Sequence, residues 1–192
     1  YSEQRIVILR EKYNLPRRYF FAPNQFWAHK NHIVVLQAVK HLKEEGQEIV
    51  VAFSGKEDDY RNKGYVAQLK VFITEHKLEA NIKFLGFMER REQLCIMKYA
   101  LAVVQPSLFE GWSTVVEDAK ATGKYIVLSN LEIHKEQVSE EVTFFDPNNP
   151  NELSQILKSI FLETPDVHRK TYDEDIFQFG NRFLELIKIG KR

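Results

Sequence analysis

The sequence predicts an α/β fold, namely a doubly wound parallel sheet of about six strands with Rossmann-like connections and C-terminal helices. Short apolar runs alternate with segments of helical period through most of the 192 residues. Several runs, such as Ile49–Phe53, are apolar on both faces, as strands of a parallel sheet covered by helices on both sides must be. The connections between runs are short, which is typical of βαβ units.

Six strands and eight helices follow from this alternation when the chain is read in order. A helix over residues 2–14 precedes the first strand. The strands are predicted at Tyr19–Ala22, Glu48–Ser54, Asn81–Leu85, Leu101–Gln105, Lys124–Ser129 and Thr143–Phe145. The helices between them are predicted over residues 32–45, 60–77, 89–99, 114–122 and 132–138. The segment Pro147-Asn148-Asn149-Pro150 breaks the alternation, and two more helices are expected over 150–162 and 166–189.

The whole chain, 1–192, is expected to form one domain with a core over about 15–165. The last predicted helix carries Phe179, Phe183, Leu186 and Ile187 at helical spacing. This apolar stripe either packs on the sheet or serves a partner domain. The chain begins at Tyr1 without an initiator Met, which suggests a piece of a longer protein.

Composition excludes several classes of protein. Apolar residues make up 44% and charged residues 28%, which is typical of a soluble globular chain. Lys+Arg and Asp+Glu are equal at 27 each and form no basic block, so a nucleic-acid partner is not expected. No apolar run reaches the ~18–20 residues of a transmembrane segment, and no signal peptide is present, so we predict a cytoplasmic protein. The single cysteine, Cys95, excludes an internal disulfide and is expected to be buried.

Residues 105–123 carry the strongest functional signal. A strand-like run is broken by Pro106, a turn with Glu110 and Gly111 follows, and a helix then opens at Ser113 or Thr114, either of which can cap it. Backbone N–H groups and the helix dipole at such a helix start can hold an anion. Glu117 lies in the first turns of that helix, so carboxylates flank the site. The pattern predicts a ligand that bears both phosphates and hydroxyls.

A second candidate segment follows the first strand, at residues 22–32. In a doubly wound sheet, ligands bind at the carboxyl ends of the strands, where this loop and the 106–113 loop both emerge. Lys30 lies near a helix start and offers a point charge for phosphate oxygens, although a lone loop lysine can also be merely solvated.

The 105–123 segment resembles the glutamate-pair signature of the retaining glycosyltransferases of family 4, which have the GT-B fold of two Rossmann-like domains. The resemblance covers residues 15–165 and is carried by Pro106-Ser107-Leu108-Phe109-Glu110-Gly111, followed by Glu117, Ala119, Ala121 and Gly123. The family usually has seven residues between the two glutamates, whereas this chain has six. A one-residue deletion in the Gly-Trp-Ser turn accounts for the difference without moving Glu117 on its helix.

The resemblance implies a role for each matching residue. Lys30 would bind the diphosphate of a nucleotide-sugar donor, and Glu117 would hold the ribose hydroxyls. Glu110 would face the donor sugar, so Lys30 and Glu110 are the candidate catalytic residues. The remaining donor-site candidates are Asn24, near the place of a family arginine; Gly86 and Phe87, beside the base or simply at a strand end; Gly111, Ser113 and Thr114, whose amides would face sugar and phosphate; and Trp112, which either stacks on a sugar or walls the pocket.

The resemblance further implies retaining sugar transfer to a hydroxyl acceptor in glycan or polysaccharide synthesis. The N-terminal acceptor domain is then absent from this sequence, and it could place the protein peripherally at the inner membrane face. The alternatives are a non-catalytic module for a nucleotide or sugar phosphate and a GT-B sugar-nucleotide epimerase. A phosphorylase would need a pyridoxal-phosphate lysine, and a flavodoxin-like regulator a phosphoacceptor Asp, and neither is found.

No cofactor or metal is expected. His29 and His32 have a His-x-x-His spacing, and Asp173-Glu174-Asp175 imitates an Asp-x-Asp metal motif. Neither is accompanied by a full set of ligands. Asn24 and Gln25 replace the family arginine, so His29 or Lys56 would have to supply part of the second positive charge.

Overall fold

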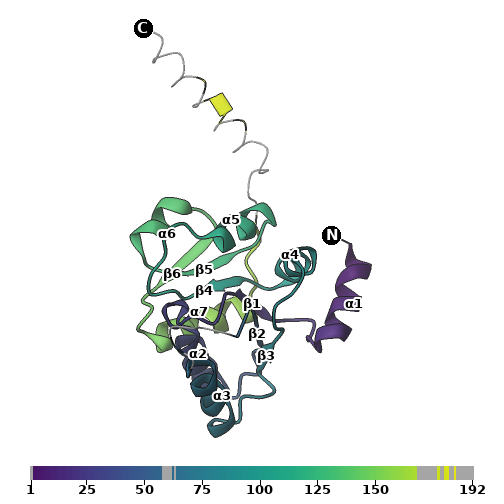
Figure 1. Cartoon of the computed structure of the whole chain (residues 1–192), viewed down its shortest axis with the longest axis vertical. Coiled ribbons are helices and arrows are strands. Elements are labelled where there is room, and N and C mark those ends of the chain that lie inside the picture. The colour runs from purple at the N-terminus through teal and green to yellow at the C-terminus, as the bar shows by residue number, and fades with distance from the viewer. Residues whose placement is uncertain are drawn as a thin grey trace.

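A six-stranded, fully parallel sheet forms the centre of the computed structural model, which describes residues 2–57, 62, 64–167, 177, 180, 181 and 184. The strand order is β3-β2-β1-β4-β5-β6, so the chain reverses direction across the sheet between β1 and β4 (Figure 1). The strands are β1 (Phe20–Pro23), β2 (Val51–Ser54), β3 (Ile82–Phe84), β4 (Val103–Gln105), β5 (Ile126–Ser129) and β6 (Val142–Phe145). This is the predicted doubly wound, Rossmann-like fold.

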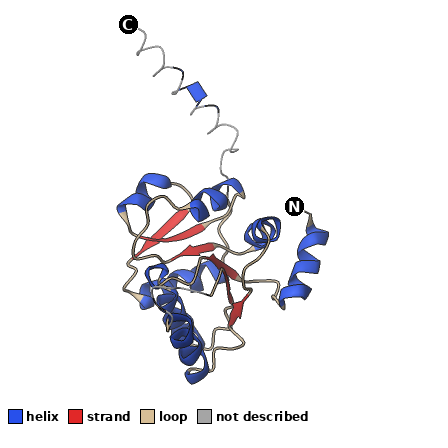
Figure 2. Cartoon of the chain, in the orientation of Figure 1, coloured by secondary structure: helices blue, strands red, loops and turns tan. Residues whose placement is uncertain are grey.

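Helices cover both faces of the sheet (Figure 2). They are α1 (Glu3–Tyr13), α2 (His32–Glu44), α3 (Tyr65–Glu75), α4 (Arg90–Tyr99), α5 (Thr114–Ala121), α6 (Glu132–Gln137) and α7 (Pro150–Leu162), with a 3-10 turn, η1, at Ala28–Lys30. Successive strand residues point to opposite faces, so Phe20 packs with α2, α3 and α7 while Phe21 packs with α1, α4 and α5. Each face thus has its own apolar cluster, as the continuous apolar strands predict.

The six predicted strands and the helices up to residue 162 are confirmed, but several begin later than expected. β2 starts at Val51 rather than Glu48 because its ladder begins where Val51 pairs with Phe20 of β1 and Ile82 of β3. β4 and β5 likewise start two residues late, at Val103 and Ile126. The described part of the helix predicted over 60–77 is α3, which ends before Lys77 with its positive φ of 55°. The helix predicted over 166–189, with its apolar stripe, lies almost wholly outside the described residues.

Hydrogen bonds tie together the loops at the carboxyl edge of the sheet. The N–H of Gly55, after β2, donates to the carbonyl of Gly86, after β3, at 3.0 Å. The loop after β1 is fixed to the loop after β4, because the N–H of Leu108 donates to the carbonyl of His29 at 2.8 Å. Asn31 Nδ2 also donates to the carbonyls of Pro106 and Pro147. The first bond joins the ends of β2 and β3, and the others join the loops after β1, β4 and β6 at the same edge of the sheet.

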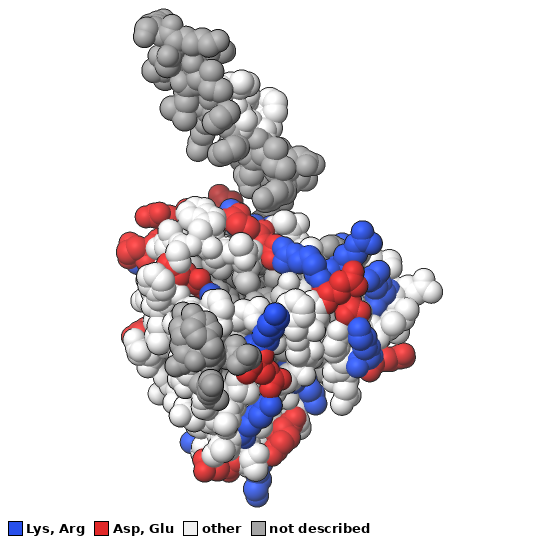
Figure 3. Space-filling view, viewed as in Figure 1, with Lys and Arg blue, Asp and Glu red and all other residues white. Residues whose placement is uncertain are grey.

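Charged side chains are interspersed over the face seen in Figure 3, with no broad patch of one sign. This agrees with the equal counts of basic and acidic residues in the sequence. The described part of the chain contains no helix long and apolar enough to cross a bilayer.

We predict that Gly55→Ala destabilises the fold. Gly55 has a φ of 152°, and a Cβ added there would lie 2.7 Å from the carbonyl carbon of Asn24, which is fixed backbone. Overpacking against backbone together with the strained φ should lower the free energy of unfolding by about 3 kcal/mol. Urea unfolding measures this. Gly111→Ala is the control, because its added Cβ would meet nothing within 4 Å. Equal unfolding free energies for the two variants would contradict the prediction.

Candidate functional site

An open pocket of about 360 Å³ lies at the carboxyl edge of the sheet. It is formed where β1 and β2 end and where α4 and α5 begin, at the reversal of strand order. Ligands of open α/β sheets bind at this kind of position. The lining comes from the loop after β1 (Pro23, Asn24, Gln25, Trp27, Lys30), the end of β2 (Ser54, Gly55), the turn after β3 (Phe87, Met88), α4 (Arg90, Gln93) and α5 (Thr114, Val115, Asp118).

Two buried polar atoms of the pocket lining lack partners. Asn24 is 4% exposed and Ser54 is 1% exposed, and among the described residues neither Asn24 Nδ2 nor Ser54 Oγ has a hydrogen-bond partner. Leaving a buried donor unpaired costs about 1–3 kcal/mol. Both residues line the pocket, but the two atoms lie just beneath its surface, so a polar ligand pairs with them only where the wall shifts on binding. Asn24 is among the predicted site residues.

The opposite wall of the pocket carries an ion pair that sequence reasoning missed. Arg90 at the start of α4 makes a two-point pair with Asp118 of α5. Arg90 Nη1 also donates to Gln93 Oε1 at 3.1 Å. Arg90 and Asp118 are 28 residues apart and belong to no local motif, so only the packing of α4 beside α5 brings them together. The guanidinium group of Arg90 therefore gives the pocket a second positively charged side chain, besides Lys30.

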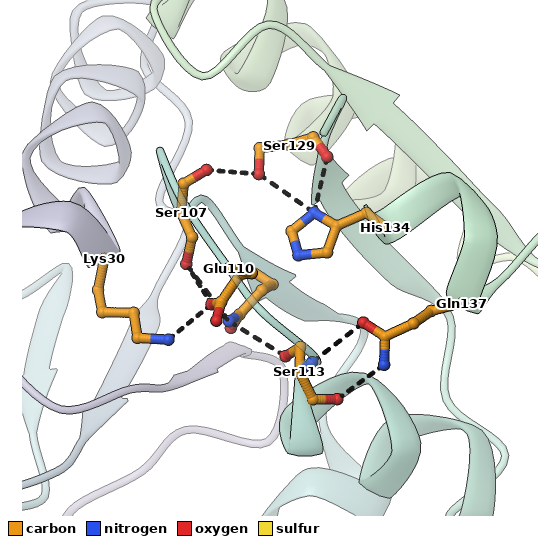
Figure 4. Close-up of polar contacts among 8 residues, drawn as sticks. Lys30, Ser107, Glu110, Ser113, Ser129, His134 and Gln137 are labelled. Atoms are coloured by element: carbon orange, nitrogen blue, oxygen red, sulfur yellow. Dashed lines mark hydrogen bonds and ion pairs between the residues drawn. The ribbon is translucent and has the colours of Figure 1, made fainter. Parts of the chain in front are cut away.

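The predicted residues Lys30 and Glu110 contact one another. Lys30 Nζ donates to Glu110 Oε1 at 2.6 Å, with the Lys30 side chain 14% exposed and that of Glu110 8% exposed (Figure 4). The same oxygen accepts hydrogen bonds from Gln105 Nε2 at 2.6 Å and Ser107 Oγ at 2.7 Å. Burial by itself raises the pKa of Glu110, but the hydrogen bonds from Lys30 and Ser107 outweigh it and hold that pKa below its ordinary value. Glu110 is therefore an ionised carboxylate.

Behind Glu110 lies a second layer of buried polar groups. Ser129 Oγ, at the end of β5, donates to the carbonyl of Ser107 at 2.6 Å. His134 Nδ1 lies 2.8 Å from the carbonyl of Ser129 and must be the donor there, because a carbonyl only accepts. Burial lowers the pKa of His134, so the ring is neutral and its Nε2 is unprotonated. Figure 4 shows the ring between Ser129 and the Glu110 cluster. Within the described residues, Nε2 has no partner.

Glu117 lies in the first turn of α5, as predicted. Its Oε2 accepts from Lys120 Nζ at 3.0 Å and its Oε1 from Gln137 Nε2 at 3.1 Å. Each carboxylate oxygen is thus held once and retains capacity to accept a further hydrogen bond. The carboxylate is fixed in place before any ligand binds.

The cap of α5 differs from the prediction. Ser113 is the N-cap residue, but its side chain makes no capping hydrogen bond and lies near Gln105 Nε2 instead. The N–H of Ser113 donates to Gln137 Oε1 at 3.1 Å. The expectation that this amide faces sugar and phosphate is therefore wrong. The amide instead donates to the buried Gln137 side chain, because the C-terminal turn of α6 packs against the start of α5.

The other predicted donor-site residues divide into two groups. Phe87 and Thr114 line the pocket with Asn24 and Lys30, whereas Gly86, Gly111, Trp112 and the two glutamates do not. The ring of Phe87 is 70% exposed, and Lys56 Nζ lies 5.2 Å from its centre. Trp112 is also mainly exposed. Both aromatic rings are accessible to a ligand or to another domain.

Comparison with known proteins identifies the family. Residues 8–174 match the model of the family described as Glycosyl transferases group 1. The chain belongs to this family. A curated relative, the O-antigen chain mannosyltransferase RfbU of Salmonella typhimurium, is 23% identical over 142 residues, which are 74% of this chain and 38% of that protein.

Solved structures of other proteins show the same fold. A glycosyltransferase from Rickettsia africae superposes with a TM-score of 0.76 at 19% identity, and Anabaena Alr3699/HepE in complex with UDP with a TM-score of 0.75 at 21% identity. Each match covers 85% of this chain and 44% of the other. The chain thus spans less than half the length of these relatives. The likeness confirms the Rossmann-like GT-B fold of this glycosyltransferase-family chain.

Of the two segments considered as metal sites, the structure describes only the one that contains His29 and His32. His32 is fully buried, stacked on Phe26 with ring centres 4.5 Å apart, and is part of the core. The acidic segment Asp173–Asp175 lies outside the described residues. Within the residues that are described, no three His, Cys, Asp or Glu side chains gather as metal ligands would. Cys95 is buried, as predicted.

We predict that His32 makes the fold acid-sensitive. Burial lowers the pKa of His32 to about 3 from 6.5, so the folded state stays neutral where the unfolded chain binds a proton. The unfolding free energy therefore falls as the pH drops from about 6.5 towards 3, by about 2 kcal/mol between pH 7 and pH 5. Urea unfolding at both pH values should show a smaller loss in His32→Phe, which keeps the ring stack. An equal loss in both proteins would contradict the assignment.

Proposed function

We propose that this chain is the donor-binding half of a retaining glycosyltransferase of family 4. It binds a nucleotide-diphosphate sugar, and the full-length protein transfers the sugar to a hydroxyl acceptor in glycan or polysaccharide synthesis. The observation that carries the proposal is the pocket at the carboxyl edge, which the polar residues Asn24, Ser54 and Lys30 line beside the start of α5. These groups suit a ligand rich in acceptor oxygens.

The comparisons support the ligand class. The Anabaena structures are described as complexes with UDP, with UDP and glucose, and with UDP-glucose. The Salmonella relative is described as a mannosyltransferase. Since the matching parts of these proteins are less than half of each, the acceptor would be bound by a second domain, as in the GT-B fold.

Lys30 is the proposed contact to the donor diphosphate. When the bond between the sugar and the diphosphate breaks, negative charge develops on the leaving diphosphate, and a prepositioned ammonium group stabilises that charge. Lys30 is paired with Glu110, so the diphosphate must either share the ammonium group with this carboxylate or displace the carboxylate from it. Glu110 accordingly has a positioning role towards Lys30 and the donor sugar rather than that of a covalent nucleophile.

Glu117 is the proposed contact to the ribose. A carboxylate with one free acceptor position on each oxygen can receive two hydrogen bonds from neighbouring hydroxyls. We further propose that donor binding needs no metal ion or cofactor, because cationic side chains and backbone donors suffice to hold the diphosphate. The cytoplasmic location and the acceptor domain remain predictions from the sequence.

We predict that Lys30 distinguishes ligands by their phosphates. Lys30→Ala should weaken binding of a nucleoside diphosphate about 10- to 100-fold, the loss of about 1.5–3 kcal/mol from a charge-assisted contact, and leave the bare nucleoside unaffected. Calorimetry with UDP, GDP and ADP and the matching nucleosides, with and without a chelator, measures this.

Two further variants sharpen this test. Lys40→Ala removes an equal charge from an α2 pair with Glu44 and should leave binding unchanged. The double variant Lys30→Ala/Glu110→Gln removes the stranded carboxylate as well, and it should also lose the diphosphate preference. Equal losses for nucleoside and diphosphate would mean that Lys30 acts through folding. A tenfold loss of wild-type affinity with the chelator would contradict the metal-free proposal.

We predict that Glu117→Ala weakens nucleotide binding and leaves the fold intact. Losing charge-assisted hydrogen bonds to ribose should cost about 1.5–3 kcal/mol of binding free energy. Glu132→Ala is the matched control, because Glu132 makes a similar i,i+3 pair with Lys135 on the exposed face of α6. An unchanged dissociation constant for the nucleoside diphosphate in Glu117→Ala would exclude the ribose assignment.

A further inference from the structure

Gln137 occupies a buried position between α6 and α5 that the sequence does not single out. It is the last residue of α6 and is 6% exposed. Its side chain points from α6 to the turn that opens α5 (Figure 4). The residue lies 24 positions after Ser113 and 20 after Glu117, so the fold alone brings them together.

The side-chain amide of Gln137 is used at both ends. Its Oε1 accepts the N–H of Ser113 at 3.1 Å, and its Nε2 donates to the carbonyl of Ser113 at 3.1 Å. The second Nε2 hydrogen is directed to Glu117 Oε1 at 3.1 Å. Both amide hydrogens are therefore committed. One side chain fixes the backbone at the helix start and the carboxylate one turn later.

The backbone of Gln137 adds a further link. Lys120 Nζ donates to the carbonyl of Gln137 at 3.3 Å and to Glu117 Oε2 at 3.0 Å. Glu117 is therefore held at one oxygen by Gln137 and at the other by a lysine that Gln137 helps to position. Without Gln137, the carboxylate would keep only the i,i+3 contact to Lys120, and such partly exposed pairs hold a side chain weakly.

We propose that Gln137 is a positioning residue for ribose recognition, which it supports by orienting Glu117. This inference rests on the proposed function, since it takes Glu117 as the ribose contact. A carboxylate held in one rotamer binds two neighbouring hydroxyls without first being ordered, so the orienting amide contributes to affinity without contacting the ligand. Gln137 thereby makes the site selective for ligands that carry both ribose hydroxyls.

The test compares Gln137→Met with the wild type on ligands that differ only in the ribose. Met has a similar length and neither donates nor accepts a strong hydrogen bond. The dissociation constants for UDP, GDP and ADP should rise about tenfold, and those for their 2′,3′-dideoxy forms should change less than twofold. In a Glu117→Ala background, Gln137→Met should have no further effect. Glu136→Met, on the exposed side of the same helix, is the control.

The outcomes separate the two proposals. Equal weakening for both ribose forms would show a merely structural role and would overturn the inference, as would no weakening at all. Failure of the wild type to bind any of the three nucleotides would overturn the proposed function, and the inference with it. If Gln137→Met does not fold by circular dichroism, Gln137→Glu replaces it. This variant keeps the acceptor for Ser113 but places a second carboxylate against Glu117, and it should weaken only the ribose-bearing ligands.

Discussion

The ion pair between Lys30 and Glu110 joins the loop after β1 to the loop after β4, 80 residues further along the chain. These strands are neighbours in the sheet, and their loops are the ones that meet where the strand order reverses. Breaking a buried pair of this kind costs about 3–5 kcal/mol, because one charge is left without its partner. The two loops beside the pocket are thus joined by an ion pair whose lysine also lines the pocket.

Polar groups around this pair are arranged in two layers. Gln105 and Ser107 hold Glu110 directly, and Ser129 and His134 support the backbone of Ser107 from behind. Buried polar networks stabilise a fold only when their members are satisfied. Among the described residues, Gln105 Oε1 and His134 Nε2 of this network lack a partner, and Asn24 Nδ2 and Ser54 Oγ beside the pocket lack one as well. When the side chains of a site are already held in place, a ligand binds without the entropic cost of ordering them.

The sequence predicted the architecture because its signals are local. Apolar strands of both faces, short connections and the stops at Pro106 and Gly123 each act within a few residues. Three contacts could not be predicted in this way. They are the ion pair of Lys30 with Glu110, the hydrogen bonds of Gln137 to Ser113 and Glu117, and the ion pair of Arg90 with Asp118. Each joins residues far apart in the chain, and each depends on how loops or helices meet in the folded chain. Ser113 is the N-cap residue of α5, as predicted, but its hydrogen bonds to Gln137 of α6 could not be predicted for the same reason.

The central claim is that a nucleoside diphosphate binds in the carboxyl-edge pocket at Lys30 and extends beyond its lining to Glu117. A crystal structure of this chain grown with UDP tests it most directly. The account predicts phosphate oxygens within hydrogen-bond distance of Lys30 Nζ, the ribose hydroxyls on the two oxygens of Glu117, and Asn24 Nδ2 and Ser54 Oγ with ligand partners. A nucleotide bound elsewhere, with all four of these side chains left without a ligand contact, would contradict it.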